Sequence, residues 1–121
     1  MAVMIDPKKA AKYFEAKLEF TTGPRELYSL MTSSPNISII DVRGSKDFQK
    51  GHIPGAVALP REKWGTLRGL SRRGINIIYG YSEECHLALI ACRFFAEHGL
   101  YVKQLEGGYA AWRQNSLPIE K

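Results

Sequence analysis

Cysteine and long apolar runs are both scarce in this chain. Two cysteines, Cys85 and Cys92, occur among 121 residues. They can form neither a disulfide framework nor a four-ligand zinc site, so we expect no metal and no cofactor. The longest uncharged stretches, such as 75–82 and 86–92, are far shorter than the roughly 20 apolar residues of a membrane-spanning helix. The sequence therefore predicts no membrane segment and a reducing compartment.

The beginning of the sequence also lacks the features of a secretory signal. Lys8 and Lys9 are not followed by the apolar stretch that such a signal requires. We therefore expect a cytoplasmic location. Hydrophobic residues make up 45% and charged residues 24% of the chain, which is ordinary for a folded soluble domain. The length fits one domain, and we expect residues 23–121 to form it, with residues 1–22 as a helical extension packed on it.

Acidic residues are outnumbered by basic ones. Lys and Arg total 17 against 12 Asp and Glu, which gives a formal net charge of +5 and favours anionic ligands. The excess is concentrated in residues 61–73, where five residues are basic and one is acidic. Only one aromatic residue, Trp64, lies there to stack on a base. We interpret the segment as a solvated loop and expect no nucleic acid partner.

Strand and helix patterns alternate along the chain. A β-branched run bounded by turn residues predicts a buried strand at 37–42, and a short apolar run predicts a second at 56–59. A third buried strand is predicted at 75–79 and a further strand at 101–105. Apolar residues spaced by three and four, with start and stop signals, predict helices at 6–20, 25–31, 87–95 and 109–114. This alternation is typical of βαβ units and predicts an α/β fold.

Three motifs together resemble the rhodanese, or sulfurtransferase, family over about residues 23–118. They are Asp41-Val42-Arg43 with Asp47-Phe48, then Gly51-His52-Ile53-Pro54-Gly55-Ala56, then Leu105-Glu106-Gly107-Gly108 with Trp112. The resemblance implies a single α/β domain whose central, mostly parallel sheet is flanked by helices. It also implies an active-site loop between the strand at 75–79 and a helix that begins near His86.

In enzymes of this family, a cysteine at the first loop position takes the outer sulfur of a donor, holds it as a persulfide, and passes it to a thiol or cyanide. The register from Tyr79 and Gly99 places Gly80 at that position. Glycine carries no sulfur, so the resemblance implies an inactive or impaired sulfurtransferase. The implied partners are a small anionic sulfur donor or a thiol acceptor. A non-catalytic module that binds an anion or a protein is the alternative.

The loop after Gly80 suggests an anion site. Successive backbone N–H groups leading into a helix N-terminus can cradle an anion, although two carboxylates in this loop oppose it. The residues concerned are Tyr81, Ser82, Glu83, Glu84, Cys85 and His86. The loop length resembles a family subgroup with a second cysteine five positions on, which Cys85 matches. Cys85 is thus either a substitute nucleophile or a packing residue, and His86 either assists it or caps the helix.

The remaining motif residues point to architecture more than to chemistry. We expect Asp41 to accept hydrogen bonds from loop N–H groups, and Arg43 to be held by an acid such as Asp47 or Glu106. His52 is expected to form hydrogen bonds within its glycine-rich turn. Gly107 and Gly108 are expected to serve backbone geometry, and Trp112 and Cys92 to pack in the core.

A phosphatase site of the type Cys, five residues, Arg is excluded by the residues present. The sixth position after Gly80 is His86, and the sixth after Cys85 is Ala91. Neither can supply the guanidinium that binds phosphate in such a site.

Overall fold

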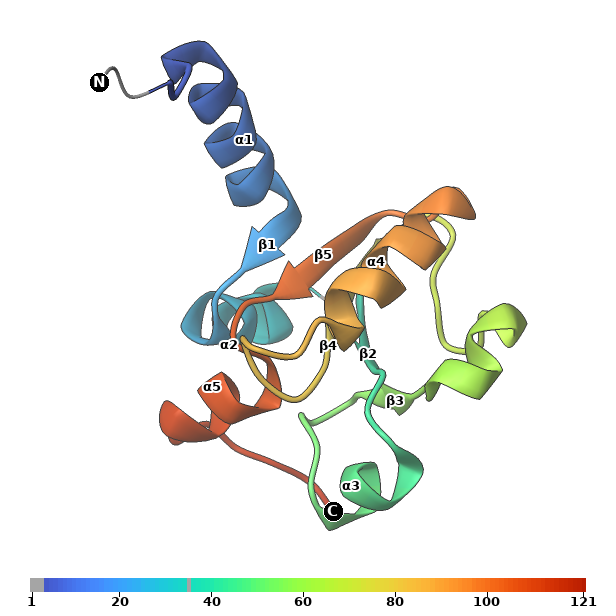
Figure 1. Ribbon diagram of the computed structural model, residues 1–121. Coiled ribbons are helices and arrows are strands. Elements are labelled where there is room, and N and C mark those ends of the chain that lie inside the picture. Colours follow the sequence, from blue (N-terminus) through green and yellow to red (C-terminus); the bar gives the residue numbers. More distant parts are fainter. Residues whose placement is uncertain (1–3, 35) are drawn as a thin grey trace.

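A five-stranded sheet forms the centre of the domain, and its strands pair in parallel (Figure 1). The computed structural model describes residues 4–34 and 36–121. The strand order is β1-β5-β4-β2-β3. The strands are β1 (Thr21–Thr22), β2 (Ile37–Asp41), β3 (Val57–Ala58), β4 (Ile75–Tyr79) and β5 (Val102–Leu105). This confirms the α/β fold with a central parallel sheet.

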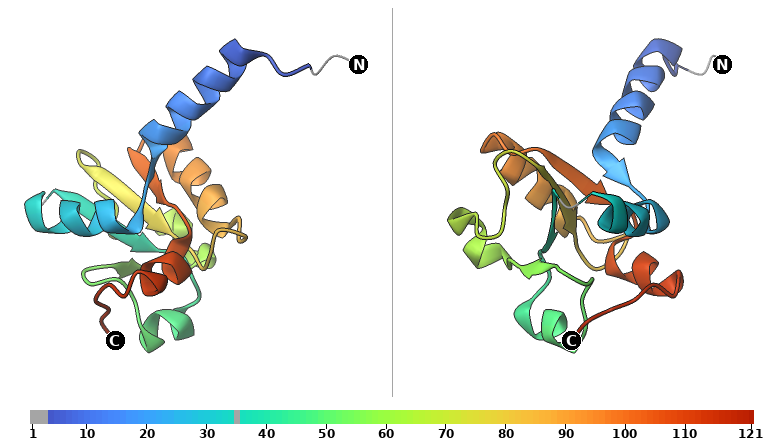
Figure 2. Two further views of the ribbon diagram at one scale, coloured as in Figure 1. Left: turned by 90° about the vertical axis from the view of Figure 1, so that its left-hand side faces the viewer. Right: turned by 180° about the vertical axis from the view of Figure 1, so that it is seen from behind.

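Helices cover both faces of this sheet (Figure 2). The helix α4 (Leu87–Glu97) and the 3-10 helix η1 (Arg61–Thr66) pack on one face, where Ile40 and Ile78 meet Trp64 and Phe95. On the other face, α2 (Pro24–Ser33) and α5 (Gly108–Gln114) bring Leu27 and Trp112 against Ile39 and Ile77. Neighbouring strand residues point to opposite faces, so each central strand contributes to both halves of the core.

The register of the two central strands sets the position of the site. β2 and β4 pair along their full length, so that Asp41 lies beside Tyr79 where both strands end. The short helix α3 (Ser45–Lys50) follows β2 at this end, and the loop 80–86 follows β4. Because the carboxyl ends of parallel strands meet at one edge, this is where ligand sites form in such sheets.

The helix α1 (Pro7–Phe20) forms where the sequence predicts it but contacts the domain only at its base, beside β1 and β5. The Asp6 carboxylate accepts a hydrogen bond from the Lys8 N–H at 2.9 Å and caps the helix start. None of the helix residues, all of which the structure describes, is buried. Figures 1 and 2 show the helix leading away from the sheet. We expect packing along the whole extension, whereas the structure shows contact at the base of the helix.

The reason is the strand that follows α1. Thr21 and Thr22 pair with Gln104 and Leu105 at the edge of the sheet, where the sequence indicates only a break between helices. β1 begins at Thr21, directly after α1 ends at Phe20, so no connecting residues allow the helix to fold back over the sheet, and α1 extends outward. Lys17, near the base of the helix, lies 3.5 Å from Glu106.

Two other short elements were not expected. The six-residue α3 and η1 are each too short to show a helical period in the sequence. η1 lies inside the basic segment 61–73, which is therefore only partly a loop. Its Trp64 is buried and donates its indole N–H to the Leu59 carbonyl at 3.0 Å. No helix among the described residues is long and apolar enough to cross a membrane.

Candidate functional site

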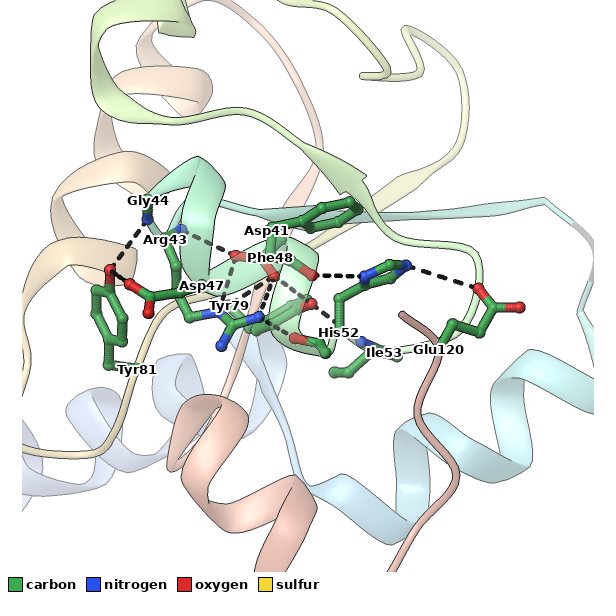
Figure 3. Close-up of polar contacts among 11 residues, drawn as sticks. Asp41, Arg43, Gly44, Asp47, Phe48, His52, Ile53, Tyr79, Tyr81 and Glu120 are labelled. Atoms are coloured by element: carbon green, nitrogen blue, oxygen red, sulfur yellow. Dashed lines mark hydrogen bonds and ion pairs between the residues drawn. The ribbon is translucent and has the colours of Figure 1, made fainter.

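A buried ion pair lies where β2 and β4 end (Figure 3). The Asp41 side chain is 0% exposed and lies 2.7 Å from the Arg43 Nη2. Its carboxylate also accepts the backbone N–H of Arg43 at 2.9 Å and the Tyr79 hydroxyl at 2.6 Å. Arg43 donates a further hydrogen bond of 2.7 Å to the Gly51 carbonyl. The pair thus joins β2, β4 and the glycine-rich turn.

The expected partners of Arg43 were wrong. Neither Asp47 nor Glu106 holds it, because Asp41 lies two residues before it and reaches the guanidinium directly. Burial alone lowers the pKa of Arg43, but hydrogen bonding and the charge of Asp41 raise it overall, so Arg43 stays charged. Burial and the charge of Asp41 raise the pKa of Tyr79, which keeps its hydroxyl a donor. The guanidinium also lies 4.0 Å from the centre of the Tyr109 ring.

The loop after β4 is bound to the start of α5. The Tyr109 and Ala110 N–H groups donate to the carbonyls of Gly80 and Tyr81, both at 2.9 Å. A Cβ at Gly108 would lie 2.7 Å from the Gly80 oxygen, so only glycine allows this approach. In a trans peptide the N–H points opposite to the C=O. The N–H groups of Tyr81 and Ser82 therefore point away from α5.

Tyr81 ties the loop to α3, a contact that the sequence did not reveal. Its hydroxyl donates to the Asp47 carboxylate at 2.7 Å and accepts the Gly44 N–H at 3.0 Å (Figure 3). Burial and the hydrogen bond to Asp47 raise the pKa of Tyr81. Asp47 thus holds the loop in place through Tyr81 and does not bind Arg43.

Gly80 lies buried at the first position of the loop and faces α4. A Cβ built at this residue would lie 3.4 Å from the Ala88 nitrogen and 3.5 Å from the Ala88 Cβ, which are ordinary contacts. The backbone is outside the left-handed region that favours glycine. The position can therefore carry a small side chain, and that side chain would point at the first turn of α4.

The rest of the loop agrees only partly with the predicted cradle. The Cys85 N–H donates to the Ser82 carbonyl at 3.2 Å, so this amide is turned inward and cannot serve an anion. Cys85 is half-buried, and Glu83 and Glu84 are exposed. His86 stands at the start of α4, but among the described residues its side chain makes no capping hydrogen bond. His86 thus occupies the N-cap position without capping the helix through its side chain.

The two cysteines should differ sharply in reactivity. Cys92 lies within α4 and packs against the core, and burial raises the pKa of its thiol to about 12. We expect one alkylation per native chain with iodoacetamide at mildly alkaline pH, at Cys85, and a second only after unfolding, because the thiolate is the reactive form. Peptide mass spectrometry identifies the modified residue. Rapid labelling of Cys92 in the native protein would contradict this.

His52 and the C-terminal segment form a second cluster near the site. The His52 Nδ1 lies 2.9 Å from the Phe48 carbonyl, and its ring stacks on Phe48 at 3.8 Å. The Nδ1 must carry the proton to donate to a carbonyl. The Nε2 faces the Glu120 carboxylate at 3.8 Å, and the two backbones pair in an antiparallel bridge. These bonds support a structural role for His52.

Curated relatives include a sulfurtransferase and a regulator. Thiosulfate sulfurtransferase GlpE of Shewanella oneidensis is 30% identical over 89 residues, which cover 69% of this chain and 83% of that protein. The HTH-type transcriptional regulator Rv0324 of Mycobacterium tuberculosis is 33% identical over 86 residues, 70% of this chain. The matched part spans only 38% of that regulator's length.

Solved structures with the same fold extend the likeness to α1. The BH2092 protein of Bacillus halodurans superposes with a TM-score of 0.85 and 30% identity, over 95% of this chain and 86% of its own. A full-length protein of Lactobacillus plantarum gives a TM-score of 0.84 at 19% identity, over 96% of this chain and 99% of its own. These shares are too large to be reached without residues of α1.

The family follows from the sequence itself. Residues 23–115 match the sequence profile of the rhodanese-like domain, which places the family boundary just after α1 and β1. The matched region contains the buried ion pair, the loop 80–86 and the two glycines that accommodate it. This chain belongs to the rhodanese-like domain family.

Proposed function

We propose that this chain is a rhodanese-like domain with the scaffold of a sulfurtransferase but without its persulfide-forming step. The observation that carries the proposal is Gly80. It is buried at the end of β4, outside the left-handed backbone region, and it faces the first turn of α4. A nucleophile at this position would have the positive end of a helix dipole beside it. The chain has no side chain there.

A small anion or a thiol is the ligand class that suits the remaining site. The N–H groups of Tyr81 and Ser82 point away from α5, and the first turn of α4 adds N–H groups without helical partners. Arg43 contributes no charge to a ligand, because Asp41 occupies it. Glu83 and Glu84 repel anions from the exposed part of the loop, so we expect binding to be weak and salt-dependent.

Catalysis by Cys85 is the second candidate function. Its sulfur is half-buried in the same loop, next to the start of α4. In that reaction the Cys85 thiolate attacks the outer sulfur of thiosulfate, sulfite leaves with the bonding electron pair, and cyanide then takes the sulfur as thiocyanate. The thiolate is regenerated, so no external oxidant or reductant is needed.

One assay separates the two functions. The wild-type chain and Cys85→Ser are incubated with thiosulfate and then cyanide, and thiocyanate is measured together with the intact mass of the protein. We expect no added sulfur atom and no turnover above the uncatalysed rate for either chain. A sulfur adduct on the wild-type chain that disappears in Cys85→Ser would overturn the proposal in favour of Cys85.

A further inference from the structure

The projecting helix α1 carries an apolar stripe that the domain leaves uncovered. Spacings of four, three and four place Pro7, Ala11, Phe14 and Leu18 on one side of the helix. The exposed fractions are 58% for Phe14 and 80% for Leu18. The stripe thus faces solvent in a single chain.

A helix in this position needs a partner to be stable. α1 has 14 residues, and isolated helices of this length are marginal in water, because most helical stability comes from packing an apolar face. Both views in Figure 2 show α1 standing clear of the sheet and of the other helices. The Bacillus and Lactobacillus structures nevertheless superpose on a chain that includes it. Within the part of one chain that the structure describes, the apolar stripe of α1 gains no such packing.

We propose that α1 pairs antiparallel with α1 of a second copy of this chain. Lys8 and Glu15 follow Pro7 and Phe14, and so they flank the stripe on the same side of the helix. We consider two helices that pair antiparallel, with Ala11 of one chain opposite Phe14 of the other. The flank that carries Lys8 and Glu15 then meets the same flank of the second chain across the interface. Lys8 then lies near Glu15 of the partner subunit, and the two-fold axis makes the same pair twice.

The charges favour this arrangement over a parallel one. In a parallel pair this flank meets the opposite flank of the partner, and Glu15 would face Ala10, which carries no charge. Lys17 lies on that opposite flank and is held by its own domain through Glu106 at 3.5 Å. The antiparallel pair therefore uses both Lys8 and Glu15.

The size of the interface sets its strength. A helix of 14 residues is about 21 Å long at 1.5 Å per residue. One apolar stripe of that length buries less than the roughly 1,200–2,000 Å² of a standard stable interface. We therefore expect a dimer that forms at high protein concentration and dissociates on dilution.

Sedimentation equilibrium over a range from low micromolar to millimolar protein tests the pairing. The wild-type chain should pass from monomer to dimer, whereas Phe14→Glu and Leu18→Glu should stay monomeric throughout. Both side chains are exposed, so these variants should keep the wild-type midpoint of urea unfolding. Lys9→Glu, on the opposite side of the same helix, is the matched control and should still dimerise. A wild-type monomer throughout, or a dimer indifferent to both stripe variants, would overturn the proposal.

A charge exchange tests the antiparallel direction. Lys8→Glu alone or Glu15→Lys alone creates two like-charge contacts per dimer, and each should weaken the dimer about tenfold at low salt. An equimolar mixture of the two variants should recover dimers, because each chain then meets the opposite charge twice. Failure of the mixture to associate better than either variant alone would contradict the antiparallel pair.

Discussion

Replacing Gly80 with cysteine should give this chain a thiosulfate:cyanide sulfurtransferase activity at least roughly a hundredfold above that of the wild type. The reason is the direction in which a side chain at this position points. Its Cβ would lie 3.4 Å from the Ala88 nitrogen, in the first turn of α4. N–H groups without helical partners and the positive end of the helix dipole both stabilise a thiolate there. A thiocyanate assay measures the gain.

The backbone should accept this replacement without rearrangement. Gly80 is outside the left-handed region, so a side chain brings no φ strain. The nearest atoms to the new Cβ belong to Ala88, at 3.4 to 3.9 Å. We expect the free energy of unfolding to change by no more than about 1 kcal/mol. Urea unfolding followed by the fluorescence of the buried Trp64 and Trp112 measures this change.

Serine is the matched control for the new thiol. Gly80→Ser adds a side chain of similar shape that cannot hold sulfur, and it should stay inactive. Gly80→Cys combined with Cys85→Ser should keep the activity if position 80 alone carries the persulfide. A folded Gly80→Cys protein whose new thiol forms no sulfur adduct with thiosulfate would show that this loop cannot activate a nucleophile.

The longer elements of the fold could be predicted because their own residues specify them. The β-branched run of β4 and the apolar pattern of α4 can each be recognised from the residues of that element alone. β1 could not be predicted in this way, because Thr21 and Thr22 form a strand only by pairing with β5. The direction of α1 depends on that same pairing. The spacing of apolar residues therefore predicted that α1 is a helix, but not its direction relative to the sheet.

The candidate site could be predicted only where a motif carries it. The sequence placed Asp41, Arg43 and Gly80 correctly at the ends of their strands. It did not show that Asp41 binds Arg43, because a buried arginine needs an acidic partner and any nearby Asp or Glu can serve as that partner. Tyr81 was also missed as a tether, since Asp47 and Gly44 meet it only after β2 and β4 have paired. Long-range contacts of this kind leave no local pattern.

The buried ion pair gives the second large effect. Arg43→Met should lower the free energy of unfolding by about 3–5 kcal/mol, because it leaves the Asp41 carboxylate charged in the core without its main partner. Methionine fills much of the same volume, so the loss reflects charge rather than a cavity. The Gly51 carbonyl also loses its hydrogen bond of 2.7 Å. The midpoint and slope of urea unfolding, followed by tryptophan fluorescence, measure the change.

Two further variants show whether the charge is the cause. Lys17→Met breaks an ion pair whose side chains are 46% and 49% exposed, and it should cost less than about 1 kcal/mol. Adding Asp41→Asn to Arg43→Met removes the uncompensated charge, so the double variant should be more stable than Arg43→Met alone. An Arg43→Met protein as stable as Lys17→Met would contradict this account, and so would a double variant in which the two losses simply add. If Arg43→Met does not fold, recovery of a cooperative transition in the double variant gives the same answer.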